Sequence, residues 1–345
     1  MKTIDVDPAD DPAWARLVES TDSDVFHSPR WLRVLRSTYG FEPRASITLD
    51  KADIPSGGTP YVRVQSLAET KVAIAPFSDY CDPLAPNSET WKTLAGRLLE
   101  HGHPVVLRSR TNPLPAEDPR FRPVGQARWH GLDLTPGCDD ILASMHPSAR
   151  RAIRKAQRSG LLLRDAHTRA DLRAFFDLHL QVRKLKYRLL AQPFRFFEAI
   201  WQEFIETGQG RITFAVRDGA PVAGVLFLRW KDRLYYKFNA SDGDALELRP
   251  NDLIVWDAIE RGTSDGMARL DFGLSDWDQE GLARYKAKFG ATEGVIRFLR
   301  HDPDVSGPAR GATAPLEALT DLLTSPEVPD SVTEAAGDVL YRYFV

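Results

Sequence analysis

The sequence predicts a mixed α/β protein made of two tandem domains, each a central mixed β-sheet flanked by helices. One observation is size: 345 residues of ordinary composition, 43% hydrophobic and 27% charged, suffice for two domains that each bury a core. The other is the order of elements, because helices followed by strands, then by a further helix and strand, occur in both halves. We place the domains at residues 1–142 and 143–302, and we expect residues 303–345 to pack on the first.

In the first domain, apolar spacing and turn signals locate the elements. A helix is expected to begin at Ser28-Pro29, because proline suits the first helical turn. A turn-rich segment, 53–58, separates the first two strands, and the proline-bounded loop 76–86 has a composition typical of loops that line a site. The expected helices are 13–18, 29–35 and 91–100, and the expected strands are 46–49, 61–67, 71–75 and 105–108.

In the second domain, three strands lie in the segment 212–240, with turns at Asp218-Gly219 and Lys231-Asp232. Pro250 opens a further helix, with Asn251 and Asp252 as early-turn or capping residues. A strand after it is expected to close at Gly273, and residues 303–315 read as a linker. The other expected helices are 146–159, 172–188, 194–207, 282–289, 316–323 and 331–344.

Composition excludes several classes of protein. No apolar run approaches the roughly 18 residues that span a bilayer, and the acidic start differs from a secretory signal, so we expect a cytoplasmic protein without membrane insertion. Cys81 and Cys138 form neither a disulfide framework nor a zinc spacing, and His101-x-His103 lacks a third ligand, so no metal is expected. The net charge of −3 confines any nucleic-acid contact to a local basic patch.

That patch is a helix with cations at i, i+1, i+4, i+5 and i+8 and almost no intervening acid, which is typical of a surface that follows phosphates. A solvated helix face is the alternative. Its members are Arg150, Arg151, Arg154, Lys155 and Arg158.

Smaller groups of side chains suggest a substrate site. Arg183 and Tyr187 lie one helical turn apart, where a guanidinium and a phenol can hold a phosphate, although an amphipathic helix edge has the same pattern. Lys286 and Lys288 flank the last core helix, as charges near a reacting centre or as surface lysines. Tyr236, Lys237 and Asn239 alternate along a strand that borders a cleft or the core. Asp79, Tyr80 and Asp82 either orient and deprotonate an amine or serve as turn residues.

The segment DFG…GL…YKAKFG at 271–290 resembles the Fem family of peptidoglycan-bridge aminoacyltransferases, on the Gcn5-related N-acyltransferase (GNAT) fold. The words FHSPRWLRVLRSTYG and the basic helix are similar to further Fem segments. The resemblance implies transfer of an aminoacyl group from charged tRNA, held partly by the basic helix, to an amine in a cleft between the halves. It implies that Lys286 stabilises the oxyanion and that Arg183 and Tyr187 contact phosphates. Trp31, Asp271 and Lys288 complete the expected substrate-binding set.

The chain departs from the Fem pattern at two positions. Asn112-Pro113 stands where Fem enzymes have Asp-Pro, and Leu35 falls near the lysine of their opening helix. The glycine-rich pyrophosphate loop of acyl-CoA-using relatives is also absent at residues 247–252, so CoA has a poorer anion nest. We therefore expect aminoacyl-tRNA as co-substrate with no bound cofactor. Acyl-CoA-dependent acyl transfer is the alternative, and a non-catalytic module that binds peptidoglycan or RNA is the third interpretation.

Overall fold

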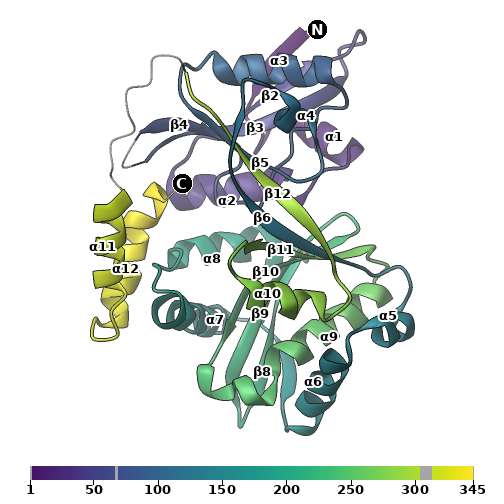
Figure 1. The fold of residues 1–345 in the computed structure, drawn as a ribbon, viewed down its shortest axis with the longest axis vertical. Helices are drawn as coiled ribbons and strands as arrows, with labels where there is room; N and C mark the ends of the chain where they lie inside the picture. The colour runs from purple at the N-terminus through teal and green to yellow at the C-terminus, as the bar shows by residue number, and fades with distance from the viewer. Residues whose placement is uncertain (1, 67–68, 304–312, 345) are drawn as a thin grey trace. The chain divides into compact units, whose positions relative to one another are not determined.

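The computed structural model describes residues 2–66, 69–303 and 313–344 and divides into two compact units (Figure 1). Unit 1 comprises residues 1–127, 295–316 and 342–345, and unit 2 comprises residues 128–294 and 317–341. The long strands β6 (Arg122–Asp133) and β12 (Thr292–His301) contribute to both units. The division therefore falls inside β6, at 127/128, rather than at the expected 142/143.

The sheet of unit 1 has the order β1-β2-β3-β4-β5-β12. All of these neighbours are antiparallel except β4 and β5, which are parallel. The strands are β1 (Lys2–Val6), β2 (Arg44–Leu49), β3 (Pro55–Gln65), β4 (Thr70–Ala73) and β5 (Val105–Ser109). The helices are α1 (Pro12–Ser20), α2 (Pro29–Tyr39), α3 (Ser88–Leu99) and α4 (Leu114–Glu117), with a 3₁₀ turn at Val25–His27.

The expected turn at 53–58 is wrong for its second half, because β3 begins at Pro55. Two glycines explain the error, since a Cβ at Gly57 would lie 2.5 Å from Thr90 of α3, and one at Gly58 would lie 2.8 Å from Leu17 of α1. Successive strand residues face opposite sides of a sheet. The glycines therefore admit a helix closely on each face of β3, whereas in the sequence they look like a turn.

Unit 2 has the strand order β6-β11-β10-β9-β8-β7. Helices α7 and α8 pack on one side of these strands and α9 on the other, with α6 against α9 (Figure 1). The strands are β7 (Leu162–Asp165), β8 (Gly210–Arg217), β9 (Ala220–Trp230), β10 (Arg233–Ser241) and β11 (Arg269–Asp276). The helices are α5 (Cys138–Ser144), α6 (Pro147–Arg158), α7 (Arg169–Gln181), α8 (Phe194–Ile200), α9 (Pro250–Ser264), α10 (Glu280–Ala287) and α12 (Asp330–Leu340).

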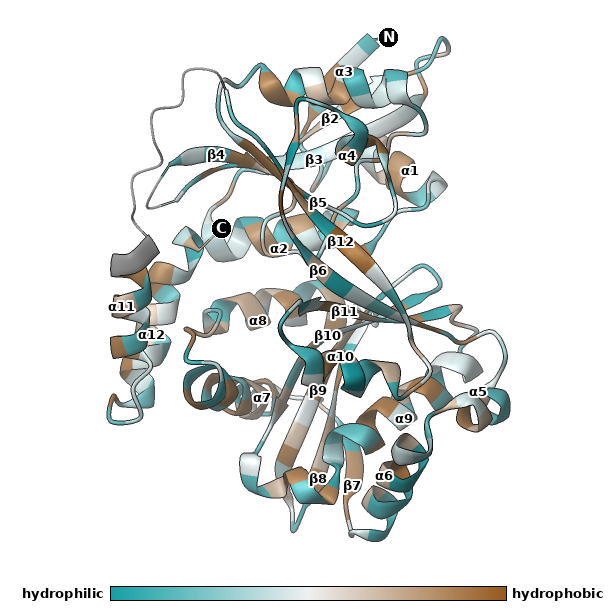
Figure 2. Ribbon diagram, viewed as in Figure 1, coloured by the Kyte–Doolittle hydropathy of each residue, from teal (hydrophilic) through white to brown (hydrophobic). Residues whose placement is uncertain are grey.

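A hydrophobic core holds α9 on this sheet. Ile254, Ala258 and Ile259 of α9 belong to one buried hydrophobic cluster with Val225 and Phe227 of β9. Figure 2 shows hydrophobic positions on both α9 and the strands. Burial of each large aliphatic side chain stabilises the unit by about 1.5–3 kcal/mol. The core therefore fixes the N-terminus of α9 beside the ends of β10 and β11, where the candidate site lies.

Several expected elements differ in their bounds, and two of them lie near the candidate site. The helix expected over 172–188 ends as an α-helix at Gln181 and continues as a π turn over Val182–Lys186. The strand expected to close at Gly273 runs on to Asp276 as β11, and Gly273 within it adopts a φ of 66°.

Residues 317–341 belong to unit 2, whereas the sequence predicts that residues 303–345 pack on the first domain. Helix α12 contacts α7 and α8, and Glu334 accepts a two-pronged ion pair from Arg173 with both distances 2.8 Å. Gly337 lies against the backbone of Ala191, where a Cβ would approach the carbonyl oxygen to 2.5 Å. Helix α11 (Thr313–Leu323) precedes α12, and the expected linker lies largely outside the described residues.

Candidate functional site

The central strands of unit 2 separate at the candidate site. β10 and β11 are parallel and pair over three positions, from Arg233↔Arg269 to Tyr235↔Asp271. β10 then bulges at Lys237 and continues to Ser241, while β11 continues to Asp276. Ligands in α/β sheets bind beyond the carboxyl ends of parallel strands. The polar groups that follow the separation point are therefore candidates for binding or chemistry.

Two tyrosines lie beyond this point. The ring of Tyr236 packs between Phe227 and Phe272, with centroid distances of 5.9 and 5.6 Å. Burial raises the pKa of Tyr236, and the neighbouring Tyr187 raises it further. Burial also raises the pKa of Tyr285, and its hydroxyl has no hydrogen-bond partner within the part of the chain that the structure describes. A buried hydroxyl without a partner is costly and often marks a place where a ligand group binds.

Asp252, in the first turn of α9, lies at the same place and is only 3% exposed. The ammonium of Lys288 binds its Oδ1 and stands 4.3 Å from the ring centroid of Tyr285. Burial raises the pKa of Asp252, although the charge and hydrogen bond of Lys288 lower it. A buried carboxylate with a raised pKa suits a group that accepts and returns a proton near neutral pH.

Side-chain hydrogen bonds connect the end of β10 to the first turn of α9. The Asn239 side chain donates to Asn251 Oδ1 at 2.8 Å, and Asn251 Nδ2 donates to Ser241 Oγ at 2.7 Å. The network ties β10 to the first turn of α9 and fixes Asn251 beside Asp252. Asn239 and Lys288 are among the residues that the sequence predicts for the site. Asp252 is predicted only as an early-turn or capping residue, and Tyr285 is not predicted as a site residue.

Lys286 is buried, at 2% exposed, and donates to the backbone carbonyls of Gly273 at 3.2 Å and Leu274 at 2.8 Å. These carbonyls belong to β11 beyond its separation from β10. The ammonium of Lys286 is therefore held next to the separation point. His130 is a buried imidazole that the sequence does not predict as a site residue. Burial is the main cause that lowers the pKa of His130, and the charge of Lys286 lowers it further. His130 Nε2 lies 3.3 Å from Glu293 Oε2 without hydrogen-bond geometry.

Arg183 and Tyr187, which were expected to act as a pair, make different contacts. Arg183 donates from Nε and Nη2 to the carbonyl of Leu190, at 3.1 and 3.0 Å, and so holds the loop after the π turn. Tyr187 is 38% exposed and close enough to Tyr236 to raise the pKa of its hydroxyl. Tyr187 thus remains a candidate site residue, at the edge of the group formed by Tyr236, Tyr285 and Asp252.

The remaining expected residues of unit 2 lie in the scaffold or at its edge. Asp271 is buried and accepts from Trp129 Nε1 at 2.8 Å and from the backbone N–H of Gly273 at 2.7 Å, so it shapes β11 rather than facing a ligand. Lys237 occupies the bulge of β10, with its ammonium 5.4 Å from the ring centroid of Phe238.

The basic helix is α6, and its five cations differ in their contacts. Arg150 Nη1 donates to the carbonyls that end α5, including Met145 O, and Arg158 Nε donates to Arg154 O at 3.1 Å. Arg151, Arg154 and Lys155 are exposed, and within residues 2–66, 69–303 and 313–344 none of them forms an ion pair. The outer face of α6 therefore carries uncompensated positive charge.

Four expected residues belong to unit 1, and three of them are structural. Trp31 is fully buried and donates to Ser78 Oγ at 2.8 Å, and Tyr80 is buried and packs edge-on against Phe26, so both side chains lie in the core of unit 1. Asp82 accepts five hydrogen bonds from the segment 109–112, so its oxygens are occupied and it is not a free base. Asp79 is half-buried and stays a candidate.

Neither a metal cluster nor a bilayer-spanning helix occurs in the part of the chain that the structure describes. No three His, Cys, Asp or Glu side chains there are grouped so that they could hold a metal ion. None of its helices has both the length and the apolar character needed to cross a membrane.

Known proteins resemble this chain in two ways: one domain matches a sequence family, and the fold matches solved structures. Residues 143–287 match the acetyltransferase (GNAT) domain family, and no curated protein matches the sequence. FemX has a TM-score of 0.65 at 14% identity, covering 86% of this chain and 97% of its own. A tandem GNAT protein from the clavulanic acid pathway has a TM-score of 0.56 at 14% identity, covering 89% and 99%.

A third solved structure is the C-terminal domain of a putative lysylphosphatidylglycerol synthetase from Agrobacterium fabrum. Its TM-score is 0.53 at 15% identity, covering 90% of this chain and 94% of its own. At these identities the three structures support the fold alone. The similarity to the acetyltransferase (GNAT) domain family rests on residues 143–287. Residues 143–287 thus match the acetyltransferase (GNAT) domain family, and the fold of the whole chain is similar to that of FemX.

Proposed function

We propose that this protein transfers an aminoacyl group from aminoacyl-tRNA to the amine of a small peptide, an amino-sugar conjugate or a peptidoglycan precursor. The observation that carries the proposal is the start of α9, which follows β10 where an acyl-CoA pyrophosphate would need free amides. Pro250 has no N–H, and the amides of Asp252 and Leu253 both donate to Arg249 O, at 3.1 and 3.3 Å. The buried carboxylate of Asp252, paired with Lys288, also lies there.

The donor would instead be held through its phosphates. Arg151, Arg154 and Lys155 give α6 an exposed cationic face without compensating carboxylates among the described residues. A face of this kind attracts the backbone of a nucleic acid and releases counterions on binding. Lysine and arginine at these positions would contact phosphates and not bases, so binding would be independent of tRNA sequence.

The reaction would be a direct aminolysis. The acceptor nitrogen forms a bond to the ester carbonyl carbon, the bond from that carbon to the tRNA ribose oxygen breaks, and a proton passes from nitrogen to that oxygen. Asp252 would receive the proton, Tyr285 would donate to the tetrahedral oxygen, and Lys286 would stabilise its charge at short range. Tyr187, Tyr236 and Asn239 would line the acceptor.

Acyl-CoA is the second candidate donor, because the matched family is an acetyltransferase family and a yeast N-myristoyltransferase solved with bound myristoyl-CoA has a TM-score of 0.50. That structure is 12% identical and covers 87% of this chain and 84% of its own, so it supports the fold. A third candidate, a binding module without catalysis, predicts that Asp252→Asn leaves biological activity intact.

The test is binding of the purified protein to mixed charged tRNA, uncharged tRNA and acetyl-CoA over a salt series. Arg151→Ala/Lys155→Ala is compared with Arg16→Ala/Lys51→Ala, which removes two exposed cations of unit 1. We expect charged tRNA to bind with a steep salt slope that falls by about two in the α6 variant only, one for each lost phosphate contact. Binding of acetyl-CoA alone contradicts the tRNA donor.

A further inference from the structure

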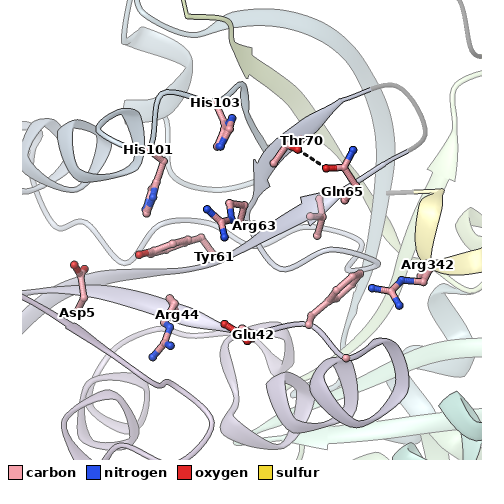
Figure 3. Close-up of a pocket in the computed structure, with 13 residues that line it drawn as sticks. Asp5, Glu42, Arg44, Tyr61, Arg63, Gln65, Thr70, His101, His103 and Arg342 are labelled. Carbon is pink, nitrogen blue, oxygen red and sulfur yellow. Dashed lines mark hydrogen bonds between the residues drawn. The ribbon is translucent and has the colours of Figure 1, made fainter.

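Unit 1 contains a cavity of about 800 Å³ (Figure 3). Its walls come from the turn after α2, from β3, from the segment after α3 and from the C-terminal end of the chain, all within unit 1. A volume of this order is typical of pockets for small molecules. None of the residues assigned to acyl transfer lines it.

Three arginines line the cavity: Arg44, Arg63 and Arg342. Figure 3 shows them on three separate segments of the chain. All three side chains are exposed, and no carboxylate of the described residues pairs with any of them within 4.0 Å. Surface arginines commonly find a carboxylate, so three without one around a single cavity form a positive site.

The two carboxylates of the cavity do not cancel this charge. Asp5 is held by the guanidinium of Arg97, which lies outside the lining, and accepts from Ser46 Oγ at 2.6 Å. Glu42 is the other carboxylate that lines the cavity. The cavity therefore keeps an excess of about two positive charges, which matches a phosphate dianion better than a single carboxylate.

Two imidazoles add further hydrogen-bonding groups. His101 and His103 both line the cavity, and the ring of His101 lies 5.0 Å from the ring of Tyr61. Burial is the main cause that lowers the pKa of His101, the charge of Asp5 raises it, and Arg63 and His103 lower it further. At neutral pH His101 is therefore uncharged and can either donate to or accept from the uncharged part of a ligand.

We propose that this cavity binds a small molecule that carries a phosphate or pyrophosphate group, with Arg44, Arg63 and Arg342 holding the phosphate oxygens. Planar guanidinium groups match phosphate geometry with two parallel hydrogen bonds each. A single phosphate occupies a small part of about 800 Å³, so the rest of the ligand extends along Tyr61 and His101. The site is separate from the proposed acyl-transfer function and stands whichever donor that reaction uses.

The experiment is calorimetric titration of the full-length protein with pyrophosphate, inorganic phosphate and citrate. Arg44→Gln and Arg63→Gln remove one lining charge each, and Arg16→Gln removes an exposed cation of α1 outside the lining. Circular dichroism melting confirms that each variant is folded. We expect pyrophosphate to bind, each lining variant to weaken it by about tenfold or more, and Arg16→Gln to leave it unchanged.

Three results overturn the proposal: no binding of pyrophosphate to the wild type, equal affinity in all three variants, or tighter binding of citrate than of pyrophosphate. The site is distinguished from tRNA binding by the α6 variant. Arg151→Ala/Lys155→Ala should keep the wild-type affinity for pyrophosphate, and Arg63→Gln should keep the wild-type salt slope for tRNA. A loss of pyrophosphate binding in the α6 variant would assign the anion to α6 and reject the cavity.

Discussion

Two carboxylates, Asp82 in unit 1 and Asp252 in unit 2, are almost equally hidden, at 5% and 3% exposed, but their surroundings are opposite. Asp82 accepts five hydrogen bonds from Ser109, Arg110, Thr111 and Asn112. Asp252 has one charged side-chain partner, Lys288, and burial raises its pKa. The number of hydrogen-bond donors around a buried carboxylate, more than the depth of its burial, therefore decides whether it stabilises a loop or can accept a proton.

The largest effect should come from removing the proton acceptor. Asp252→Asn keeps the size of the side chain, and we expect kcat/KM for amide formation to fall by about 100- to 1,000-fold, the usual contribution of a general base. The measurement is transfer from ¹⁴C-aminoacyl-tRNA to a mixed pool of small amines. An Asp252→Asn protein with wild-type transfer would remove Asp252 from the mechanism.

The matched change in unit 1 should affect stability instead. Asp82→Asn replaces an acceptor of five hydrogen bonds by a group that cannot accept all of them. We expect the free energy of unfolding to fall by about 2–3 kcal/mol, as when buried donors lose a charged acceptor. Urea unfolding followed by circular dichroism measures it. Full stability together with lost transfer activity would reverse the roles of Asp82 and Asp252.

A smaller effect is expected from removing the hydroxyl of Tyr285. Tyr285→Phe removes a hydroxyl that has no hydrogen-bond partner among the described residues, so stability should be unchanged or slightly higher. If that hydroxyl donates to the tetrahedral oxygen, kcat should fall by about tenfold with KM nearly unchanged. A stable variant with wild-type kcat would show that the hydroxyl is only a packing feature.

The smallest effect is a pH dependence of stability. Because the pKa of Asp252 is raised in the folded protein, that protein binds more protons than the unfolded chain between about pH 3.9 and the raised value. The contribution of Asp252 to the free energy of unfolding therefore decreases as pH rises through this window. Urea titrations at pH 4 to 7 should show a weaker decrease in Asp252→Asn, and identical slopes would contradict the raised pKa.

The sequence predicts most of the fold because local signals specify it. Ser28 caps α2 with its side chain accepting from Trp31 N, and Gly266 follows α9 with a φ of 69°, as start and stop signals require. Gly57 and Gly58 are the instructive failure. Their role depends on α3 and α1, which come from other parts of the chain.

The candidate site was harder to predict, because its contacts are distant in sequence. Asp252 and Lys288 are 36 residues apart, and neither carries a local signal for the ion pair that joins them. Asp82 looked like an exposed turn residue, yet its donors lie 27 to 30 residues further along the chain. Trp31 lies in a segment that resembles Fem proteins, but its indole is part of the core.

The central claim is that the donor is aminoacyl-tRNA and that Asp252 handles the proton. The most direct measurement is a competition in which the protein receives ¹⁴C-aminoacyl-tRNA and ³H-acetyl-CoA together with a mixed pool of small amines. We predict ¹⁴C in the amide product, little ³H, and loss of the ¹⁴C product in Asp252→Asn. An amide product that carries ³H and no ¹⁴C would contradict the account.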